Sequence, residues 1–201
     1  CMKTIKIWNG NISDRQLNEI AARLDAGELV ILPTDTAYAV TCDALNIKSI
    51  DRICRMKGIN PDKTNLSILC SDISMAAEYS RISNSHFRML KENTPGPFTF
   101  IFRSASSLPK AFKGRKTVGI RIPDNRLTLA VVERFGRPLL TTTIEYADED
   151  YAVNPELISE SYEGRADMMV EGGNGSTDVS TIVDCTENTP EITREGLGEL
   201  L

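Results

Sequence analysis

The sequence predicts an α/β protein folded as one domain over residues 1–201, and three observations support this. Short apolar runs of strand length alternate with amphipathic segments of helix length along the chain. Several amphipathic segments are flanked by residues that begin and end helices. No internal repeat, low-complexity segment or long linker interrupts the 201 residues, so one domain is the better expectation.

The N-terminal segments show the alternation first. Residues 4–8 (TIKIW) have the character of a strand. A helix follows, because Ser13 is a suitable N-cap, Gln16 occupies the capping-box position and Gly27 ends the segment. Its apolar positions repeat at helical spacing, so we expect one face of this helix to cover a sheet.

A buried strand and a second helix come next. Residues 28–33 (ELVILP) form an apolar run that Pro33 ends, and a polar turn is predicted from residue 34. A helix is predicted over 46–58, between an asparagine N-cap and a terminal glycine.

The rest of the chain continues the pattern. Further strands are predicted at 66–70, 95–103, 117–122, 138–144, 166–170, 180–184 and 191–195. Helices are predicted at 74–92 (one or two), at 125–136 and near 154–163.

The composition argues against several classes of protein. No run approaches the 18 apolar residues of a membrane helix, and the N-terminus lacks the apolar core of a signal peptide. We therefore expect a cytoplasmic protein without a membrane partner. The cysteines are odd in number and far apart, form no CxxC pair and accompany a single histidine: Cys1, Cys42, Cys54, Cys70 and Cys185. A zinc site is not expected, and the cysteines are interpreted as small, mostly buried residues.

Charge is distributed unevenly along this acidic chain, whose formal net charge is −5. Residues 103–126 hold seven basic residues and one acid, whereas residues 145–201 hold 15 acids and two bases. One interpretation of the basic stretch is a solvated loop beside a strand. The other is a surface that faces something strongly anionic, such as a phosphate chain.

Hydroxyl-bearing residues follow two of the predicted strands. Residues 34–38 (TDTAY) come directly after the strand at 28–33, and residues 141–143 (TTT) end the strand at 138–144. Open α/β sheets bind ligands just beyond the carboxyl ends of their strands. The alternatives are a turn whose side chains bond their own backbone, and simple β-propensity of threonine.

Isolated basic residues have both a structural and a functional interpretation. Arg121 stands between two isoleucines of a strand, a position favoured where the guanidinium meets a carboxylate or phosphate; a structural salt bridge is equally compatible. Lys57 ends a helix and complements its dipole, and Arg194 fits an ordinary exposed position. His86 is expected on a helix surface, without a catalytic role.

The sequence contains no familiar nucleotide or hydrolase motif. GxxxxGK[ST], GxGxxG and G-x-S-x-G are all absent. Spacing by itself therefore leaves the function open.

Seven stretches taken in order resemble the YrdC/YciO family over nearly the whole chain. They are PTDTAYAV, the region of Lys57, PGPFTFIF, TVGIRIP, PLLTTT, STIVD and ITREG. The YciO-type branch is the most similar, by RICRMKG, NTPGPFTFIF and REGLG. The resemblance implies a twisted mixed sheet with helices packed around a deep, positively charged cavity. It also implies threonylcarbamoyl-adenylate synthesis, a nucleotidyl transfer that joins L-threonine, bicarbonate and ATP, releases pyrophosphate and supplies a tRNA modification.

The resemblance also implies roles for particular residues. Four match positions that surround threonine: Thr34, Arg121, Thr141 and Ser180. Three match positions that contact ATP: Lys57, Thr143 and Arg194. Mg²⁺ is expected to accompany ATP, while no catalytic residue or protein metal ligand is assigned. A flexible basic rim for phosphate or RNA is expected from Lys113, Arg115 and Lys116.

Two departures from the synthase pattern concern the nucleotide. Ile59 stands where the synthases have the arginine of a K-G-R-P stretch, and Glu145 stands where they have the asparagine of S-A-N. Losing a cation and gaining an anion should weaken triphosphate binding, because charge-assisted hydrogen bonds contribute about 1.5–3 kcal/mol each. Lys63 is a candidate substitute cation, and Glu145 would either hold Mg²⁺ or turn outward.

Two alternative functions stay open beside the synthase. One is a protein of the same fold that binds double-stranded RNA or tRNA, since duplex RNA is recognised mainly by shape and phosphate contacts. The other is an enzyme that kept the nucleotide cavity but uses a different acyl substrate.

Overall fold

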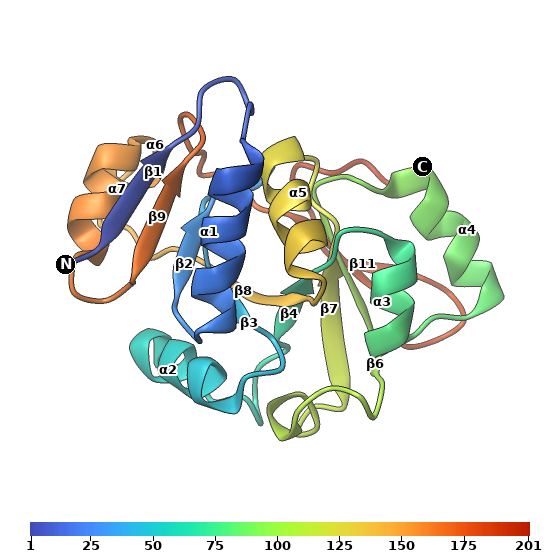
Figure 1. Ribbon diagram of the computed structural model, residues 1–201. Coiled ribbons are helices and arrows are strands. Elements are labelled where there is room, and N and C mark those ends of the chain that lie inside the picture. The colour runs from blue at the N-terminus through green and yellow to red at the C-terminus, as the bar shows by residue number, and fades with distance from the viewer.

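One long mixed sheet runs through the molecule (Figure 1). A computed structural model describes all 201 residues. Its strands are β1 (Lys3–Lys6), β2 (Val30–Leu32), β3 (Ala39–Asp43), β4 (Ser67–Leu69), β5 (Ser80–Arg81), β6 (Phe98–Ser104), β7 (Thr117–Arg121), β8 (Leu139–Thr143), β9 (Met168–Glu171), β10 (Thr181–Asp184) and β11 (Glu191–Arg194). They are ordered β1-β9-β2-β3-β8-β4-β7-β6-β10-β11, with β5 paired to β6.

The sheet contains both parallel and antiparallel pairs. The pairs β1/β9, β2/β9, β4/β7 and β6/β10 are parallel, and the remaining pairs are antiparallel. The predicted α/β class and mixed sheet are therefore confirmed.

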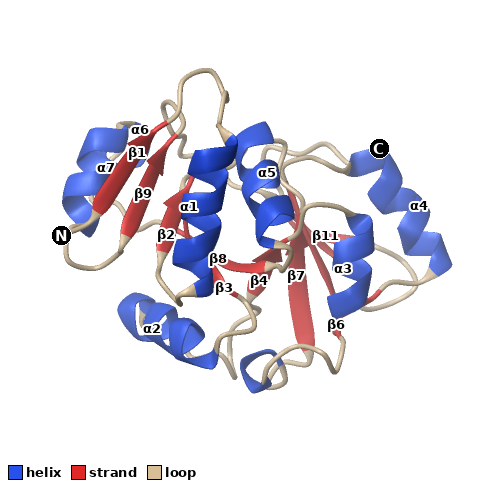
Figure 2. Cartoon of the chain, in the orientation of Figure 1, coloured by secondary structure: helices blue, strands red, loops and turns tan.

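Seven α-helices surround the sheet (Figure 2). They are α1 (Asp14–Asp25), α2 (Ile47–Lys57), α3 (Ile73–Tyr79), α4 (Asn84–Asn93), α5 (Arg126–Phe135), α6 (Asp150–Val153) and α7 (Pro155–Tyr162). A 3₁₀ turn, η1, spans Lys110–Phe112. None of the helices combines the length and the apolar character needed to cross a bilayer.

The predicted helix caps are present. The Ser13 hydroxyl accepts a hydrogen bond from the Gln16 amide, and the Gln16 side-chain oxygen accepts one from the Ser13 amide, which is a complete capping box. At the end of α2, Gly58 takes a left-handed conformation with φ of 65°, which glycine adopts without a Cβ penalty. This cap fixes the end of the helix that carries Lys57.

The core has two parts, one on each face of the sheet. On one face, α1 and α5 lie side by side (Figure 1) and bury Leu17, Ile20 and Leu24 together with Val131 and Val132. On the other face, apolar residues of α2, α4 and α7 pack with the phenylalanines of β6. The sheet is therefore a central layer covered on both faces.

Three sequence expectations require correction. Strand β3 was not predicted, because its residues, AVTCD, follow a polar turn and include a charged side chain, yet all five are buried between β2 and β8. The short helix α6 was also missed. His86 does not lie on the helix surface: it is buried, its Nε2 is 3.2 Å from the Asn188 carbonyl oxygen, and its ring packs against Phe102.

The cysteine expectation is confirmed. Four cysteines are buried without disulfides: Cys42, Cys54, Cys70 and Cys185. Burial raises the pKa of each of these thiols, so they act as small apolar residues.

Candidate functional site

A cavity of about 200 Å³ lies beside the central strands, and two arginines line it. We call it the arginine cavity; its lining residues are Ile53, Ile59, Thr64, Asn65, Leu66, Ser67, Thr99, Arg121, Leu140, Thr141, Thr142, Thr143, Ser180, Ile182 and Arg194. Seven of these residues carry hydroxyls, and none carries a carboxylate. The lining is thus suited to an anion that accepts hydrogen bonds.

Arg121, the last residue of β7, is the most buried charge in the cavity, with 7% of its surface exposed. Its Nη2 donates to Asp35 Oδ1 at 2.9 Å and to Thr36 Oγ1 at 3.2 Å. Burial lowers the pKa of this guanidinium, as does Arg194, while Asp35 raises it. Its Nε is buried and has no hydrogen-bond partner. The protein therefore holds the guanidinium through Nη2 alone, and the buried Nε–H is left without an acceptor.

Asp35 holds Arg121 in place from the turn after β2. Its Oδ2 accepts a hydrogen bond from the Asp124 amide at 2.8 Å, so the carboxylate joins that turn to the segment after β7. The salt bridge that the sequence allowed for Arg121 is present. The pairing does not use Nε, so the salt bridge and a ligand-binding role are compatible.

Arg194 reaches the cavity from β11, at the edge of the sheet. Its Nη2 donates to the Ser180 carbonyl oxygen at 2.7 Å and to Ser180 Oγ at 3.1 Å, and the Ser180 hydroxyl lies 2.7 Å from Thr99 Oγ1. Arg194 is exposed, but these bonds fix its orientation. Thr99 is not identified as a site residue from the sequence, although a polar residue within the apolar run PFTFIF could have indicated one.

The hydroxyls predicted near threonine are only partly brought together. Thr141 and Ser180 line the arginine cavity with Arg121. Thr34 does not line it: its Oγ1 bonds the Ala37 carbonyl oxygen at 2.7 Å and lies 3.1 Å from Thr36 Oγ1. This is the local turn that the sequence offered as an alternative. Thr34 reaches Arg121 only through Thr36.

Tyr38, from the same turn, is directed elsewhere. Its hydroxyl donates to the Gly173 carbonyl oxygen at 2.6 Å and accepts from the Gly172 amide at 3.0 Å. Burial raises the pKa of Tyr38 to about 12, so the phenol is neutral at physiological pH. Tyr38 therefore anchors the loop after β9.

Of the residues matched to ATP, Thr143 and Arg194 line the cavity and Lys57 lies beside it. Lys57 Nζ donates to the Thr143 carbonyl oxygen. Burial lowers the pKa of this ammonium, Glu145 raises it and Arg165 lowers it. Lys57 is thus held against the strand that supplies the threonines.

The two departures from the synthase pattern occupy different places. Ile59 lines the cavity and packs against the core. Glu145 does not line it; its half-exposed carboxylate lies 3.8 Å from Arg165 Nη1. Glu145 therefore lies outside the cavity lining and pairs with Arg165.

The predicted basic rim is not part of the cavity lining. Lys113 and Lys116 line a separate hollow of about 390 Å³, which we call the basic hollow, together with Arg81 and Arg103. Arg115 instead donates to the Lys63 carbonyl oxygen at 3.5 Å. The sequence did not indicate that Arg81 joins these cations, because strand β5 was not predicted.

Comparison with known families gives a match over most of the chain. The model of the Sua5_yciO_yrdC family, described as "Telomere recombination", matches residues 22–196. YciO of Escherichia coli strain K12, described as an uncharacterized protein, is 33% identical over 193 residues, or 94% of this chain and 93% of the relative. The threonylcarbamoyl-AMP synthase of Bacillus subtilis is 28% identical over 205 residues, covering 97% of this chain and 59% of the synthase.

Solved structures agree with the sequence relatives. The crystal structure of E. coli YciO matches with a TM-score of 0.91 and 31% identity, covering 99% of this chain and 98% of that one. Pyrococcus abyssi Sua5 complexed with L-threonine shares the fold, with a TM-score of 0.86 and 24% identity over 96% of this chain and 57% of Sua5. The same sheet and helices thus recur in all three proteins.

Proposed function

The chain belongs to the Sua5/YciO/YrdC family, and from this premise we propose that it is a cytoplasmic nucleotidyltransferase of the threonylcarbamoyl-AMP synthase type. Its substrates would be L-threonine, bicarbonate and ATP, and its product would serve the modification of tRNA. The observation that carries the proposal is the buried, unpartnered Nε of Arg121 in a cavity without carboxylates. The B. subtilis and P. abyssi relatives named as threonylcarbamoyl-AMP synthases support it.

The proposed chemistry asks little covalent work of the protein. The threonine amine combines with bicarbonate to give a carbamate and water. A carbamate oxygen then attacks the α-phosphorus of ATP, the bond to the β-phosphate oxygen breaks, and pyrophosphate leaves. The protein must align two anions that repel each other and stabilise the charge on the leaving group. Fixed cations and hydroxyls are sufficient for this task.

We assign the threonine carboxylate to Arg121, because its free Nε is the donor that an additional oxygen would satisfy. Thr141 and Ser180 line the same cavity, and we assign them to the same ligand. Thr34 is assigned a positioning role, since it contacts Thr36 rather than the cavity. The nucleotide would extend towards Lys57, Thr143 and Arg194.

Mg²⁺ would enter with ATP, held by the phosphates. The cavity lining offers no carboxylate, and no group of three or more His, Cys, Asp or Glu side chains is arranged to hold a metal ion. Mg²⁺ in nucleotide sites usually binds substrate phosphates, several waters and one or two carboxylates. This lining supplies no carboxylate, so the phosphates and waters alone would hold the ion.

Pyrophosphate release tests the proposal directly. We expect release to require L-threonine, bicarbonate and ATP together, and Arg121→Lys to remove most of it. Lysine keeps the charge but lacks the Nε donor and the planar fork. Arg134→Lys is the matched control, because that arginine is paired with Asp14 and Asn18 away from the cavity. Equal release without threonine would overturn the threonine assignment and favour an enzyme with a different acyl substrate.

Binding of RNA duplexes or tRNA is a second candidate function, and the basic hollow favours it. Arg81, Arg103, Lys113 and Lys116 converge there, and the only carboxylate paired with any of them is Glu187, which is 3.6 Å from Arg103. We expect a plot of log affinity for an RNA duplex against log salt concentration to become less steep, by about one in slope, for each lysine removed. Lys48→Ala, on α2, is the control. A slope unchanged in Lys113→Ala and Lys116→Ala would remove the basic hollow from RNA binding.

A further inference from the structure

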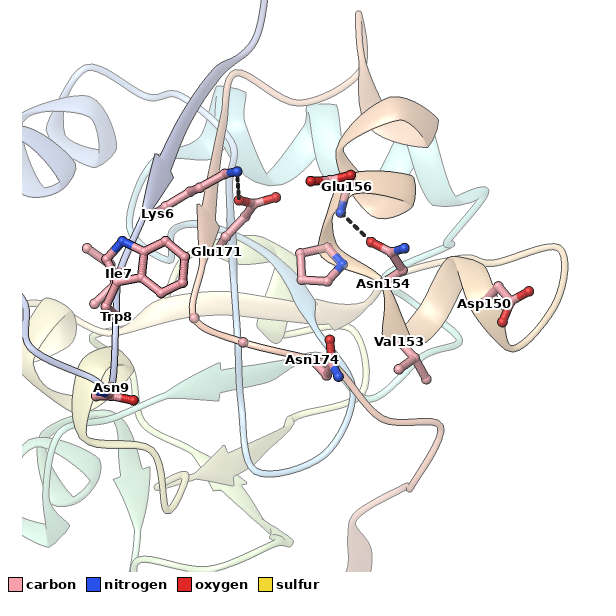
Figure 3. Close-up of a pocket in the computed structure, with 13 residues that line it drawn as sticks. Lys6, Ile7, Trp8, Asn9, Asp150, Val153, Asn154, Glu156, Glu171 and Asn174 are labelled. Carbon is pink, nitrogen blue, oxygen red and sulfur yellow. Dashed lines mark hydrogen bonds and ion pairs between the residues drawn. The ribbon is translucent and has the colours of Figure 1, made fainter.

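A pocket of about 720 Å³ lies away from the arginine cavity and shares no residue with it. We call it the Trp8 pocket. The end of β1, the loop after β9 and the start of α7 form its walls (Figure 3). The function proposed above uses none of its residues.

Glu171 is the unusual group in this pocket. It ends the otherwise apolar strand β9 and is only 8% exposed. Its backbone carbonyl accepts a hydrogen bond from the Ile7 amide, but its carboxylate makes none. The nearest cation, Lys6 Nζ, is 3.9 Å from Oε2, beyond hydrogen-bond distance. Burial raises the pKa of this carboxyl, Lys6 lowers it and Glu156 raises it. Its only partner is this long ion pair with Lys6, so the carboxylate is free to accept a hydrogen bond from a ligand that enters the pocket.

Trp8 supplies an apolar wall next to this carboxylate. Its indole is 75% exposed, so much of its apolar surface is open to a ligand. Figure 3 shows the indole beside Glu171, with the side chains of Asn154 and Asn174 across the pocket. An aromatic face next to a carboxylate is the arrangement that attracts an organic cation, through the ring quadrupole and the opposite charge together.

The charge of the lining narrows the class of ligand. Its ionisable residues are one lysine and three carboxylates: Lys6, Asp150, Glu156 and Glu171. A phosphate-bearing ligand would be repelled by this balance, whereas a cation would be attracted. The volume exceeds that of an inorganic cation by far, so it leaves room for an apolar chain beside the indole.

We propose that the Trp8 pocket binds an organic cation, with an ammonium or guanidinium group at Glu171 and its alkyl chain along the indole of Trp8. The cation is either a free diamine or guanidine, or a lysine or arginine side chain presented by a peptide. The floor is prebuilt, because Tyr38 holds the Gly172 amide and the Gly173 carbonyl by its hydroxyl. Binding therefore needs no rearrangement of the loop after β9.

The chain contains a single tryptophan, so intrinsic indole fluorescence reports on this pocket alone. Putrescine, agmatine and 1,4-butanediol, the neutral counterpart of putrescine, are titrated into the full chain at millimolar concentrations. We expect a saturable change with the two cations and none with the diol. An acetylated tripeptide with a central arginine, compared with its citrulline counterpart, separates a peptide source from a free cation.

Two variants secure the assignment. Glu171→Gln should weaken cation binding about tenfold, the worth of a charge-assisted hydrogen bond. Glu199→Gln, an exposed acid outside the pocket, should leave it unchanged. Cation binding to Trp8→Ala is measured by calorimetry and should be severalfold weaker. The substitution should not disturb folding, because the indole is exposed. No response to any cation, an equal response to the diol, or equal affinities for Glu171→Gln and Glu199→Gln would overturn the proposal.

Discussion

At the scale of single residues, Arg121 shows how one guanidinium serves the fold and still offers a donor to a ligand. Its Nη2 is used by Asp35 and Thr36, and its Nε is left over inside the molecule. Removing one partner of a buried ion pair is far more damaging than never having had the pair, because the other charge stays buried and uncompensated.

We therefore predict that Asp35→Asn lowers the free energy of unfolding by about 3 kcal/mol. Asp14→Asn is the control, because Asp14 pairs with Arg134 at the surface and should cost less than about 1 kcal/mol. Urea denaturation of the three proteins measures both. Equal losses for the two variants would show that burial does not strengthen the Arg121 pair.

Ile59 and Glu145 are both departures from the synthases, but only Ile59 faces the cavity. We predict that Ile59→Arg tightens ATP binding about tenfold at low salt, through one added charge-assisted contact. The gain should shrink as salt screens the charges. Glu145→Asn should have little effect, because its carboxylate pairs with Arg165 outside the lining.

Calorimetric titration of ATP measures these affinities, with a thermal melt as the folding control. If a well-folded Ile59→Arg bound ATP no more tightly than the parent chain, the position would lie outside the nucleotide site. A large gain from Glu145→Asn would instead show that its carboxylate reaches the triphosphate.

At the scale of elements, strand β9 has a carboxyl group at each end, and folding shifts the pKa values of the two groups in opposite directions. Although burial raises the pKa of Asp167, hydrogen bonds from Arg52 and the Leu29 amide outweigh this and lower it. Glu171, at the other end of the strand, has a raised pKa. A carboxyl whose pKa is lowered by folding stabilises the fold above its unfolded-state pKa, and this contribution is lost on acidification. A carboxyl whose pKa is raised by folding favours the fold only at low pH.

We therefore predict that Glu171→Gln is more stable than the parent chain near pH 7, and that the difference vanishes below about pH 4. Asp167→Asn should be less stable near pH 7, and its deficit should also vanish on acidification. Unfolding free energies measured by urea across this range test the two signs. A Glu171→Gln protein less stable than the parent at pH 7 would mean that Lys6 alone compensates the charge.

Strand β7 is packed too closely against its neighbours to carry a side chain at Gly119. A Cβ there would collide with Ser67 Oγ and would lie 2.9 Å from Thr99 Cγ2. We predict that Gly119→Ala costs about 1–3 kcal/mol by overpacking. Adding Ser67→Ala should recover part of the loss in denaturation experiments. No recovery would place the strain at Thr99 instead.

The elements that could be predicted are those whose signals are local. The caps of α1 and α2 and the apolar runs of β2, β4 and β8 were correctly predicted, because capping and burial depend on neighbouring residues. Strand β3 could not be predicted, because its buried Asp43 pairs with Arg137, which is 94 residues away. His86 was misplaced for the same reason, since its partner Asn188 is distant in sequence.

In the candidate site too, features with local signals could be predicted and features that depend on distant residues could not. The turn at 34–38 and the position of Arg121 were visible in the sequence, but Asp35 as the partner of Arg121 was not. The separation of Lys113 and Lys116 from the cavity depends on how the loop between β6 and β7 folds. The Trp8 pocket had no local signal, because it joins residues 6–9 to residues 150–174.

At the scale of the whole molecule, acidic and basic regions are segregated in space as well as in sequence. The basic hollow is lined by residues 81–116, and the Trp8 pocket draws three carboxylates from residues 150–171. With opposite local charge at two hollows, the molecule is suited to binding an anion and an organic cation at the same time.

The pairing of β1 with β9 also determines when β1 can form its strand pair during translation. Residues 3–6 leave the ribosome long before residues 168–171, which are their only strand partner. Contacts this distant in sequence are slow to form, and an unpaired strand is vulnerable to aggregation until its partner arrives. We predict that nascent chains stalled before residue 160 are cleaved by protease within the first ten residues, and that chains extending well beyond residue 171 are protected. Protection of the shorter chains would mean that β1 has another partner while the protein is being made.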